Sequence, residues 1–291
     1  MSLESCFPSC FPLGIRSQNA LDQLCSLEPE ALNAVDSQAL AAALPRDAFA
    51  LVKGEASYPD FLTDLGEEAP QVLAGLGNTE VLSHERFVSI VGSRDADENR
   101  CRTTRRIAET LAASGFVIVS GLAAGIDRAA HLGAFDAENG RTIAVLGTPL
   151  CRPYPPENAE LAAAIADGRG LLLSETAQLA GLTACEAERT AALRRRNRIV
   201  AALGHGTLVM AARSGSSTLI EARAGLSIGR PVLIWHEAAA DAKARGEDWP
   251  EALMRLAESA AASDADPLVS IVDSAQAVFE RLSPWQSVWW L

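Results

Sequence analysis

The segment FVIVSGLAAGIDRAAHLGAF, residues 116–135, decides the fold of this 291-residue chain. Phe116–Val119 is an apolar run typical of a buried strand, and Arg128–Phe135 has the pattern of a helix. Between them, SGLAAGID places a serine and two glycines at a strand-to-helix turn. Backbone N–H groups at the start of a helix, where the helix dipole is positive, favour a bound anion. The turn therefore predicts a phosphate site, although glycines at such turns also serve only to permit a tight bend.

The same pattern of strands and helices recurs from residue 87 onward. Continuous apolar runs that alternate with helical segments indicate a parallel sheet covered on both faces. We therefore predict an α/β fold with a doubly wound, Rossmann-like parallel sheet, in which ligands bind at the carboxyl ends of the strands. The predicted strands are Phe87–Val91, Phe116–Val119, Thr142–Leu146, Gly170–Leu173, Thr207–Ala211 and Pro231–Ile234. The predicted helices are Arg102–Ala113, Arg128–Phe135, Asn158–Ala166, Arg194–Leu203 and Thr218–Leu226.

Two flanking regions have a different pattern. Apolar residues at loose helical spacing over 17–44, ended by Pro45, predict a small helical region. A short strand is expected at Val72–Ala74, and the tail predicts helices at Glu251–Ala262 and Ser274–Leu282 around the apolar run Leu268–Val272. We expect three parts: an N-terminal helical region (1–50), a Rossmann-like phosphate-binding domain (51–240) and a mainly helical C-terminal tail (241–291).

Charge is distributed unevenly along the chain. The net charge of −12 argues against nucleic-acid binding if it is taken for the whole chain. Residues 81–230, however, hold 18 basic and 15 acidic residues, and all of these basic residues are arginine. Arginine forks bind phosphates bidentately and stack on bases. A GC-rich genome that encodes arginine in place of lysine explains the same bias, so the bias alone decides little.

Other classes are disfavoured by what the sequence lacks. The six cysteines include no CxxC pair, and Cys6 and Cys10 have no nearby histidine, so we expect reduced thiols and no metal site. No apolar run approaches the ~20 residues of a membrane span. A signal peptide is not apparent either. These features predict a cytoplasmic protein that does not enter membranes.

Small or phosphate-binding residues follow nearly every predicted strand. Because the carboxyl ends of parallel strands meet at one edge of a sheet, the turns are expected to form one site. The candidate residues are Gly92, Ser93, Arg94, Ser120, Gly121, Gly125, Asp127, His131, Tyr154, Asn158, Glu175, Arg194, Arg196, Asn197, Arg198, Ser214, Gly215, Ser216, Ser217 and Thr218.

Each candidate also has a purely structural interpretation. Asp127 is also suited to stabilising a helix start, and Asn158 to capping the next helix. His131 is also suited to the interior as a hydrogen-bonded core histidine. Glu175 also fits a loop carboxylate without a binding role. The arginines at 194–198 also fit the solvent-exposed face of a helix.

Several motifs together resemble one known family. Gly92-Ser93-Arg94, SGLAAGID with His131, Thr142–Gly147, Tyr154-Pro155 with Asn158, Leu173-Ser174-Glu175, Arg196–Val200 and Ser214-Gly215 follow one another in family order. On these motifs, residues 55–235 resemble the DNA-processing protein A family, also called DprA or Smf. The resemblance implies a Rossmann-like protein that binds single-stranded DNA without catalysis and without a cofactor.

The same resemblance implies partners and contacts. Such proteins protect incoming strands during transformation, form homodimers and help to load a RecA-type recombinase. Phosphates are then expected at Arg94, Ser120, Gly121 and the Arg194–Arg198 segment. Aromatic stacking platforms for bases are scarce, because only 5% of the residues are aromatic and only Tyr154 lies near the site.

The chain also departs from the family pattern. Met210-Ala211-Ala212 replaces the usual acidic residue after the fifth strand, and Trp235-His236-Glu237 replaces the usual Pro-Gly after the sixth. The Ser214-Gly215 turn is longer than usual, and Ser214–Glu221 resembles the loop of LOG-type phosphoribohydrolases, with Thr218 and Glu221 matching. A nucleotide-binding enzyme or sensor, with Glu221 acting on the ribosyl bond, is therefore the alternative. A protein-interaction role with a vestigial pocket is a third possibility.

Overall fold

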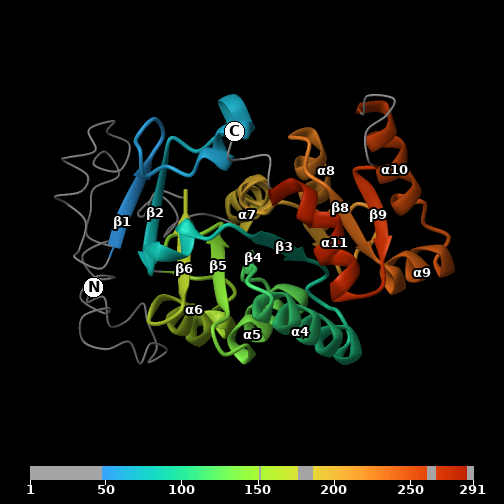
Figure 1. Ribbon diagram of the computed structural model, residues 1–291, viewed down its shortest axis with the longest axis horizontal. Helices are drawn as coiled ribbons and strands as arrows, with labels where there is room; N and C mark the ends of the chain where they lie inside the picture. The colour runs from blue at the N-terminus through green and yellow to red at the C-terminus, as the bar shows by residue number, and fades with distance from the viewer. Residues whose placement is uncertain (1–47, 151, 176–185, 261–266, 287–291) are drawn as a thin grey trace. The chain divides into compact units, whose positions relative to one another are not determined.

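The computed structural model describes residues 48–150, 152–175, 186–260 and 267–286 (Figure 1). The chain divides into two compact units: unit 1 comprises residues up to Ser83 with Ile143–Arg196, and unit 2 comprises His84–Thr142 with the residues from Asn197 onward. Strand β5 (Arg141–Leu146) and helix α7 (Glu186–Leu203) each run from one unit into the other. The helical region predicted at 17–44 lies outside the described residues.

Unit 2 contains a run of parallel strands in the order β4-β3-β7-β8-β9. Strand β3 has the predicted bounds, Phe87–Val91, and is buried at every position. A continuous apolar run of this kind belongs to a strand covered on both faces. Three further strands lie within two residues of their predicted bounds, whereas the fourth, β9, forms within the apolar run Leu268–Val272, for which no strand was predicted. The four are β4 (Val117–Ser120), β7 (Thr207–Val209), β8 (Val232–Trp235) and β9 (Val269–Val272).

The predicted helices of unit 2 are present, with ends shifted by up to four residues. Helix α4 begins four residues before the predicted Arg102, because the Asp97 carboxylate caps it by accepting a 2.9 Å hydrogen bond from the Arg100 N–H. Helix α9 was not predicted, although HEAAADAKA is rich in strong helix formers. The helices are α4 (Glu98–Ala113), α5 (Ile126–Asp136), α8 (Ser217–Ser227), α9 (His236–Ala244), α10 (Trp249–Ala260) and α11 (Ala275–Gln286).

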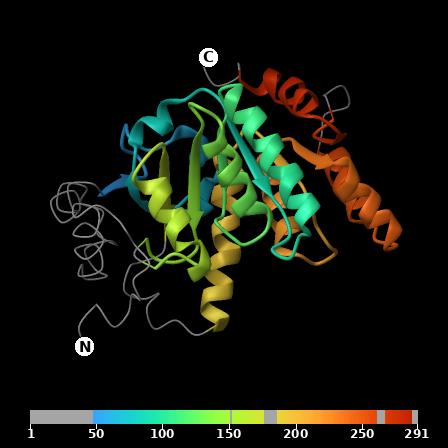
Figure 2. The same cartoon turned by 90° about the horizontal axis from the view of Figure 1, so that it is seen from below.

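The direction of winding reverses in the middle of unit 2. From β3 the chain passes through α4 to β4, and from β7 it passes through α8 to β8 on the other side. Right-handed crossovers in opposite directions place the two helices on opposite faces, as Figure 1 shows. Helices α4 and α5 lie side by side in front of the strands in Figure 2. The predicted doubly wound, Rossmann-like fold is confirmed, and its switch point lies between β3 and β7, where ligands of such folds bind.

The two central strands are tied together at their amino ends. The Phe87 N–H of β3 donates to His205 Nδ1 at 3.0 Å, just before β7. The Ser89 hydroxyl donates to the Val200 carbonyl of α7 at 2.6 Å. Burial lowers the pKa of His205 to about 4, so the neutral ring accepts this bond at pH 7.

Unit 1 contains antiparallel pairs that the sequence did not indicate. Strand β2 (Val72–Gly77) pairs antiparallel with both β1 (Ala48–Val52) and β6 (Gly170–Ser174). Strand β1 was missed because no helix follows it that would mark a strand–helix repeat. Among the residues that the structure describes, the remaining elements that lie wholly in this unit are η2 (Asp60–Glu68), η3 (Thr79–Ser83), η4 (Pro156–Asn158) and α6 (Ala159–Ala166).

Within the described ranges, no helix combines the length and the apolar character needed to cross a membrane.

Candidate nucleic-acid site at the strand ends of unit 2

The first turn, residues 120–127, joins β4 to α5 and packs on the end of β3. Gly125 has φ = 71°, and a Cβ atom added there would lie 2.5 Å from the carbonyl oxygens of both Ser93 and Arg94. The Ile126 N–H donates to the Ser93 carbonyl at 3.3 Å. Only glycine fits this backbone and this close approach. Two predicted motifs, Gly92-Ser93-Arg94 and SGLAAGID, are therefore in contact.

Side chains inside the first turn hold its shape. The Asp127 carboxylate accepts a 3.2 Å hydrogen bond from the Ala123 N–H. The Ser120 hydroxyl is fully buried and donates to the Ile90 carbonyl at 2.7 Å. Leu122 has φ = 60°, an uncommon conformation for a residue with a side chain, and is fully buried. The Ser120 and Asp127 side chains thus support the backbone of the turn.

The first turn leaves backbone donors open, and an arginine follows the neighbouring strand. The backbone N–H groups of Ala124 and Gly125, which immediately precede α5, donate no hydrogen bond to any of the described residues. Arg94 follows β3 with an exposed side chain. Open amides at a helix start and a nearby guanidinium are the groups that bind phosphate oxygens. The first turn therefore presents the kinds of group that an anion site uses.

The second turn, residues 213–218, joins β7 to α8 at the same edge. Gly215 has φ = 78°, and Ser216 occupies the N-cap position without a side-chain cap hydrogen bond. Asn197 on α7 donates through Nδ2 to the Ser217 carbonyl at 3.1 Å. Thr218 and Glu221 are buried on α8, each 5% exposed. The predicted residues of the fifth strand end therefore do gather around the start of α8.

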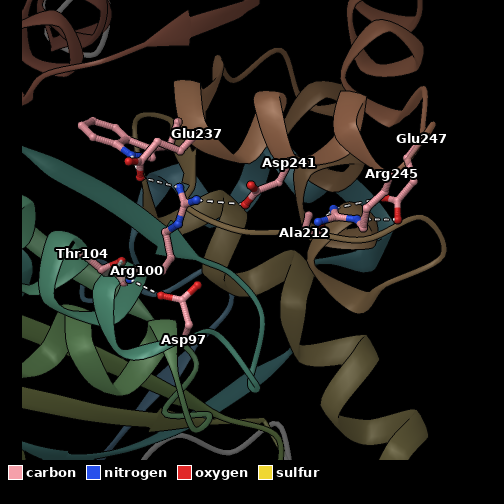
Figure 3. Close-up of polar contacts among 9 residues, drawn as sticks. Asp97, Arg100, Thr104, Ala212, Glu237, Asp241, Arg245 and Glu247 are labelled. Atoms are coloured by element: carbon pink, nitrogen blue, oxygen red, sulfur yellow. Dashed lines mark hydrogen bonds and ion pairs between the residues drawn. The ribbon is translucent and has the colours of Figure 1, made fainter.

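One donor of the second turn is already occupied. The Ser214 N–H donates to the Glu247 carboxylate at 3.0 Å. Glu247 follows helix α9, and Figure 3 shows it bound to Arg245, which also reaches the Ala212 carbonyl. Neither residue was predicted, because nothing in their local sequence points back to a turn 33 positions earlier.

The arginines at positions 194–198 on α7 differ in exposure and in their contacts. Arg194 is exposed, Arg196 is 4% exposed and Arg198 is half-buried. Arg195, which is exposed, donates through Nε to the Glu175 carboxylate at 3.3 Å. In unit 1 the Arg189 guanidinium lies 5.0 Å from the centroid of the Tyr154 ring, so a cation already stacks on the aromatic candidate.

Two predicted residues have structural surroundings. His131 is fully buried, and its Nδ1 lies 2.7 Å from the Thr142 hydroxyl, which itself donates to the Ile118 carbonyl. This geometry matches the core-histidine interpretation, since the ring does not reach solvent. Asn158 occupies the predicted N-cap position of α6 without the side-chain hydrogen bond of a cap, and it is 1% exposed.

The described side chains include no group of three metal-binding residues close enough to hold an ion.

Comparison with known proteins is consistent with this geometry. Protein Smf of Synechocystis sp. is 40% identical over 184 residues, which cover 62% of this chain and 44% of that protein. The crystal structure of DNA processing protein A from Streptococcus pneumoniae is 29% identical with a TM-score of 0.65, covering 81% of this chain and 74% of that chain. DNA processing protein A from Helicobacter pylori is 23% identical with a TM-score of 0.60, covering 81% and 96%, and shows the shared fold.

The chain spans about half the length of the curated relatives it matches. The family model described as DNA recombination-mediator protein A matches residues 49–265, which is well over half of the chain and includes both turns. On this match, the chain belongs to the DNA recombination-mediator protein A family.

Proposed function

We propose that this chain binds single-stranded DNA through phosphates at the carboxyl ends of β3 and β4. The observation that carries the proposal is the first turn, where the open N–H groups of Ala124 and Gly125 begin α5 while exposed Arg94 follows β3. The Helicobacter pylori relative is described as having a single-stranded DNA binding mode, which supports the choice of ligand. Phosphate contacts carry no sequence information, so we expect little sequence preference.

The acidic parts of the chain limit where DNA lies. Residues 231–291 hold 4 basic and 10 acidic residues, which repel a polyanion. Duplex DNA has a stiffer and wider backbone than a single strand and needs a broader positive surface. We therefore expect weaker binding of duplex than of single strands.

The test is fluorescence anisotropy with labelled oligo(dT) and a matched duplex. Arg94→Ala is expected to weaken single-strand binding about tenfold or more, because a charge-assisted contact is lost. Arg106→Ala is the control, since Arg106 is equally exposed on α4 and its substitution changes the net charge by the same amount. Equal losses in the two variants, or equal binding of duplex, contradict the proposal.

Salt dependence measures the same contacts independently. The logarithm of affinity falls with the logarithm of salt at about −0.7 per phosphate neutralised on a single strand. Arg94→Ala is expected to make this slope shallower by about one such contact. A flat salt response of the unsubstituted protein contradicts phosphate binding.

The alternative enzyme is separated by one further measurement. Glu221, the residue that the alternative assigns to the ribosyl bond, is buried on α8 beside the second turn. We expect no release of base from nucleoside monophosphates and unchanged DNA binding in Glu221→Gln. Turnover by the unsubstituted protein that disappears in Glu221→Gln replaces DNA binding with the phosphoribohydrolase-like function.

Family membership supports three broader proposals. We propose that the chain acts in the cytoplasm, forms a homodimer and assists a RecA-type recombinase on single-stranded DNA. Light scattering after gel filtration tests the dimer, and strand exchange by a recombinase in the presence of the chain tests the assistance. The boundaries at residues 50 and 240 are likewise proposed, and limited proteolysis tests them.

A further inference from the structure

The second turn is filled by a carboxylate of the same chain. Glu247 Oε2 accepts from the Ser214 N–H at 3.0 Å, and its side chain is only 18% exposed. Arg245 donates to the same carboxylate through Nε at 2.9 Å and through Nη2 at 3.3 Å. A backbone amide and an arginine fork are the partners that a phosphate oxygen takes. Glu247 therefore stands where an anion is expected at this turn.

The segment that carries Glu247 is anchored away from the turn. Arg100, 8% exposed on α4, lies 2.9 Å from the carboxylates of both Glu237 and Asp241 on α9 (Figure 3). The Trp235 ring N–H also donates to Glu237 at 3.1 Å. These contacts fix α9 after β8, and the chain then passes from Gly246 into Glu247. The anchored helix α9 thus positions the segment that follows it, which places the Glu247 carboxylate at the turn.

The electrostatics keep this carboxylate ionised. The hydrogen bond from Arg245 has the largest effect and lowers the pKa of Glu247; desolvation opposes it, and the Ser214 N–H adds a further lowering. The pKa of Arg245 is raised by the same pair. Arg245 also donates to the Ala212 carbonyl at 2.8 Å, which holds the pair against the end of β7.

We infer that Glu247 sets the extent of the DNA footprint by acting as a built-in phosphate mimic at the second turn. The strand contacts the first turn freely, and it reaches the second turn only where Glu247 is displaced. Arg245, released from Glu247, then becomes a phosphate ligand. This inference rests on the proposed DNA-binding function, and it makes Glu247 a residue that determines site size.

Glu247→Gln is the direct test, with oligo(dT) as the probe. We expect about three- to tenfold tighter binding, and a salt slope steeper by about 0.7, because the turn gains one phosphate. Glu251→Gln is the matched control, since Glu251 is exposed in the first turn of α10 and loses the same charge. Arg100→Gln is expected to act in the same direction more weakly, because it frees α9 rather than the turn.

The outcomes are distinguishable. Equal tightening by Glu247→Gln and Glu251→Gln with no change of slope shows a long-range charge effect and overturns the inference. Unchanged affinity in Glu247→Gln, with Arg94→Ala still weakening binding, overturns the inference and leaves the proposed function standing.

A measurement without DNA tests whether Glu247 occupies the anion position of the second turn, even if no DNA strand binds. Inorganic phosphate is titrated while the Ser214 amide is followed by ¹⁵N NMR. We expect a saturable shift in Glu247→Gln and none in the unsubstituted protein. The same response in both proteins shows that Glu247 does not occupy the anion position, and the inference is then wrong.

Discussion

The two turns that flank the end of β3 are built in different ways. The first turn is held by its own residues: Asp127 binds the Ala123 N–H, and Gly125 packs on the carbonyls of Ser93 and Arg94. The second turn is held from outside, by Glu247 on the Ser214 N–H. Both contain glycine and serine at the start of a helix, yet the first has open donors and the second is occupied. Turn composition therefore shows where an anion site can form, and the surrounding fold decides whether it is available.

The largest expected difference between the turns is in their glycines. Gly125→Ala should lower the free energy of unfolding by about 3–4 kcal/mol, because the new Cβ meets two backbone carbonyls at a strained positive φ. Gly215→Ala should cost only about 1–2 kcal/mol, since its positive φ is strained but the space around it is open. Urea denaturation measures both. Similar losses for the two variants contradict a tightly packed first turn and a loose second one.

Acid should destabilise the fold where β3 and β7 are tied together at their amino ends. The buried His205 has a pKa of about 4, against 6.5 unfolded, so the unfolded chain takes up the proton first as pH falls. Stability is therefore full above pH 6.5 and is lost toward pH 4, by at most about 3 kcal/mol. His205→Asn keeps an acceptor for the Phe87 N–H and does not titrate. The difference in unfolding free energy between the two proteins should shrink across this range, and a constant difference speaks against a neutral buried ring.

The carboxylates at the two turns should differ in their contribution to folding. Asp127 is 7% exposed, and Asp127→Ala should lower the free energy of unfolding by about 1–2 kcal/mol through the lost hydrogen bond. Glu247→Ala should cost less, because water can replace it on Ser214. Thermal unfolding under identical conditions gives the comparison. A larger loss of unfolding free energy in Glu247→Ala than in Asp127→Ala contradicts the view that the first turn depends on its own carboxylate more than the second turn depends on Glu247.

The smallest expected effect is that of pH on the role of Glu247 at the second turn: we expect no change between pH 8 and pH 5. Arg245 lowers the pKa of Glu247, so the carboxylate stays charged from pH 8 to pH 5. The ratio of DNA affinities between Glu247→Gln and the unsubstituted protein should be constant over this range. Anisotropy titrations at several pH values test it. A ratio that approaches one near pH 5 means that the carboxyl protonates and that Arg245 does not hold it.

Sequence patterns predicted the parts of the molecule that are local. Strand β3 was predicted with its observed bounds, because Phe87–Val91 is a continuous apolar run that ends at Gly92. The contact between Gly125 and the Ser93 carbonyl follows from two motifs at neighbouring strand ends. Burial was harder to foresee: a histidine five residues past Ile126 looked like part of the site, yet His131 packs on Thr142 inside the fold.

Contacts between distant segments were not predictable. The Glu247 contact joins residues 33 positions apart, and the Arg100 contact to Asp241 spans 141 positions. Glu247, Arg100 and Asp241 belong to no motif, and α9 itself was not anticipated. The alanine-rich composition of residues 236–244 was the one available signal, and it indicates a helix without saying where its side chains reach.

The pairing of β3 with β7 also sets an order of events during synthesis. Phe87 and His205 are 118 positions apart, so a growing chain that has not yet reached Thr207 can pair β3 only with β4. Such long-range pairings form slowly because a large loop must close first. The first turn can therefore form on a nascent chain well before the second turn has a strand to follow. An unfinished chain exposes one flank of β3, which chaperones can cover until β7 arrives.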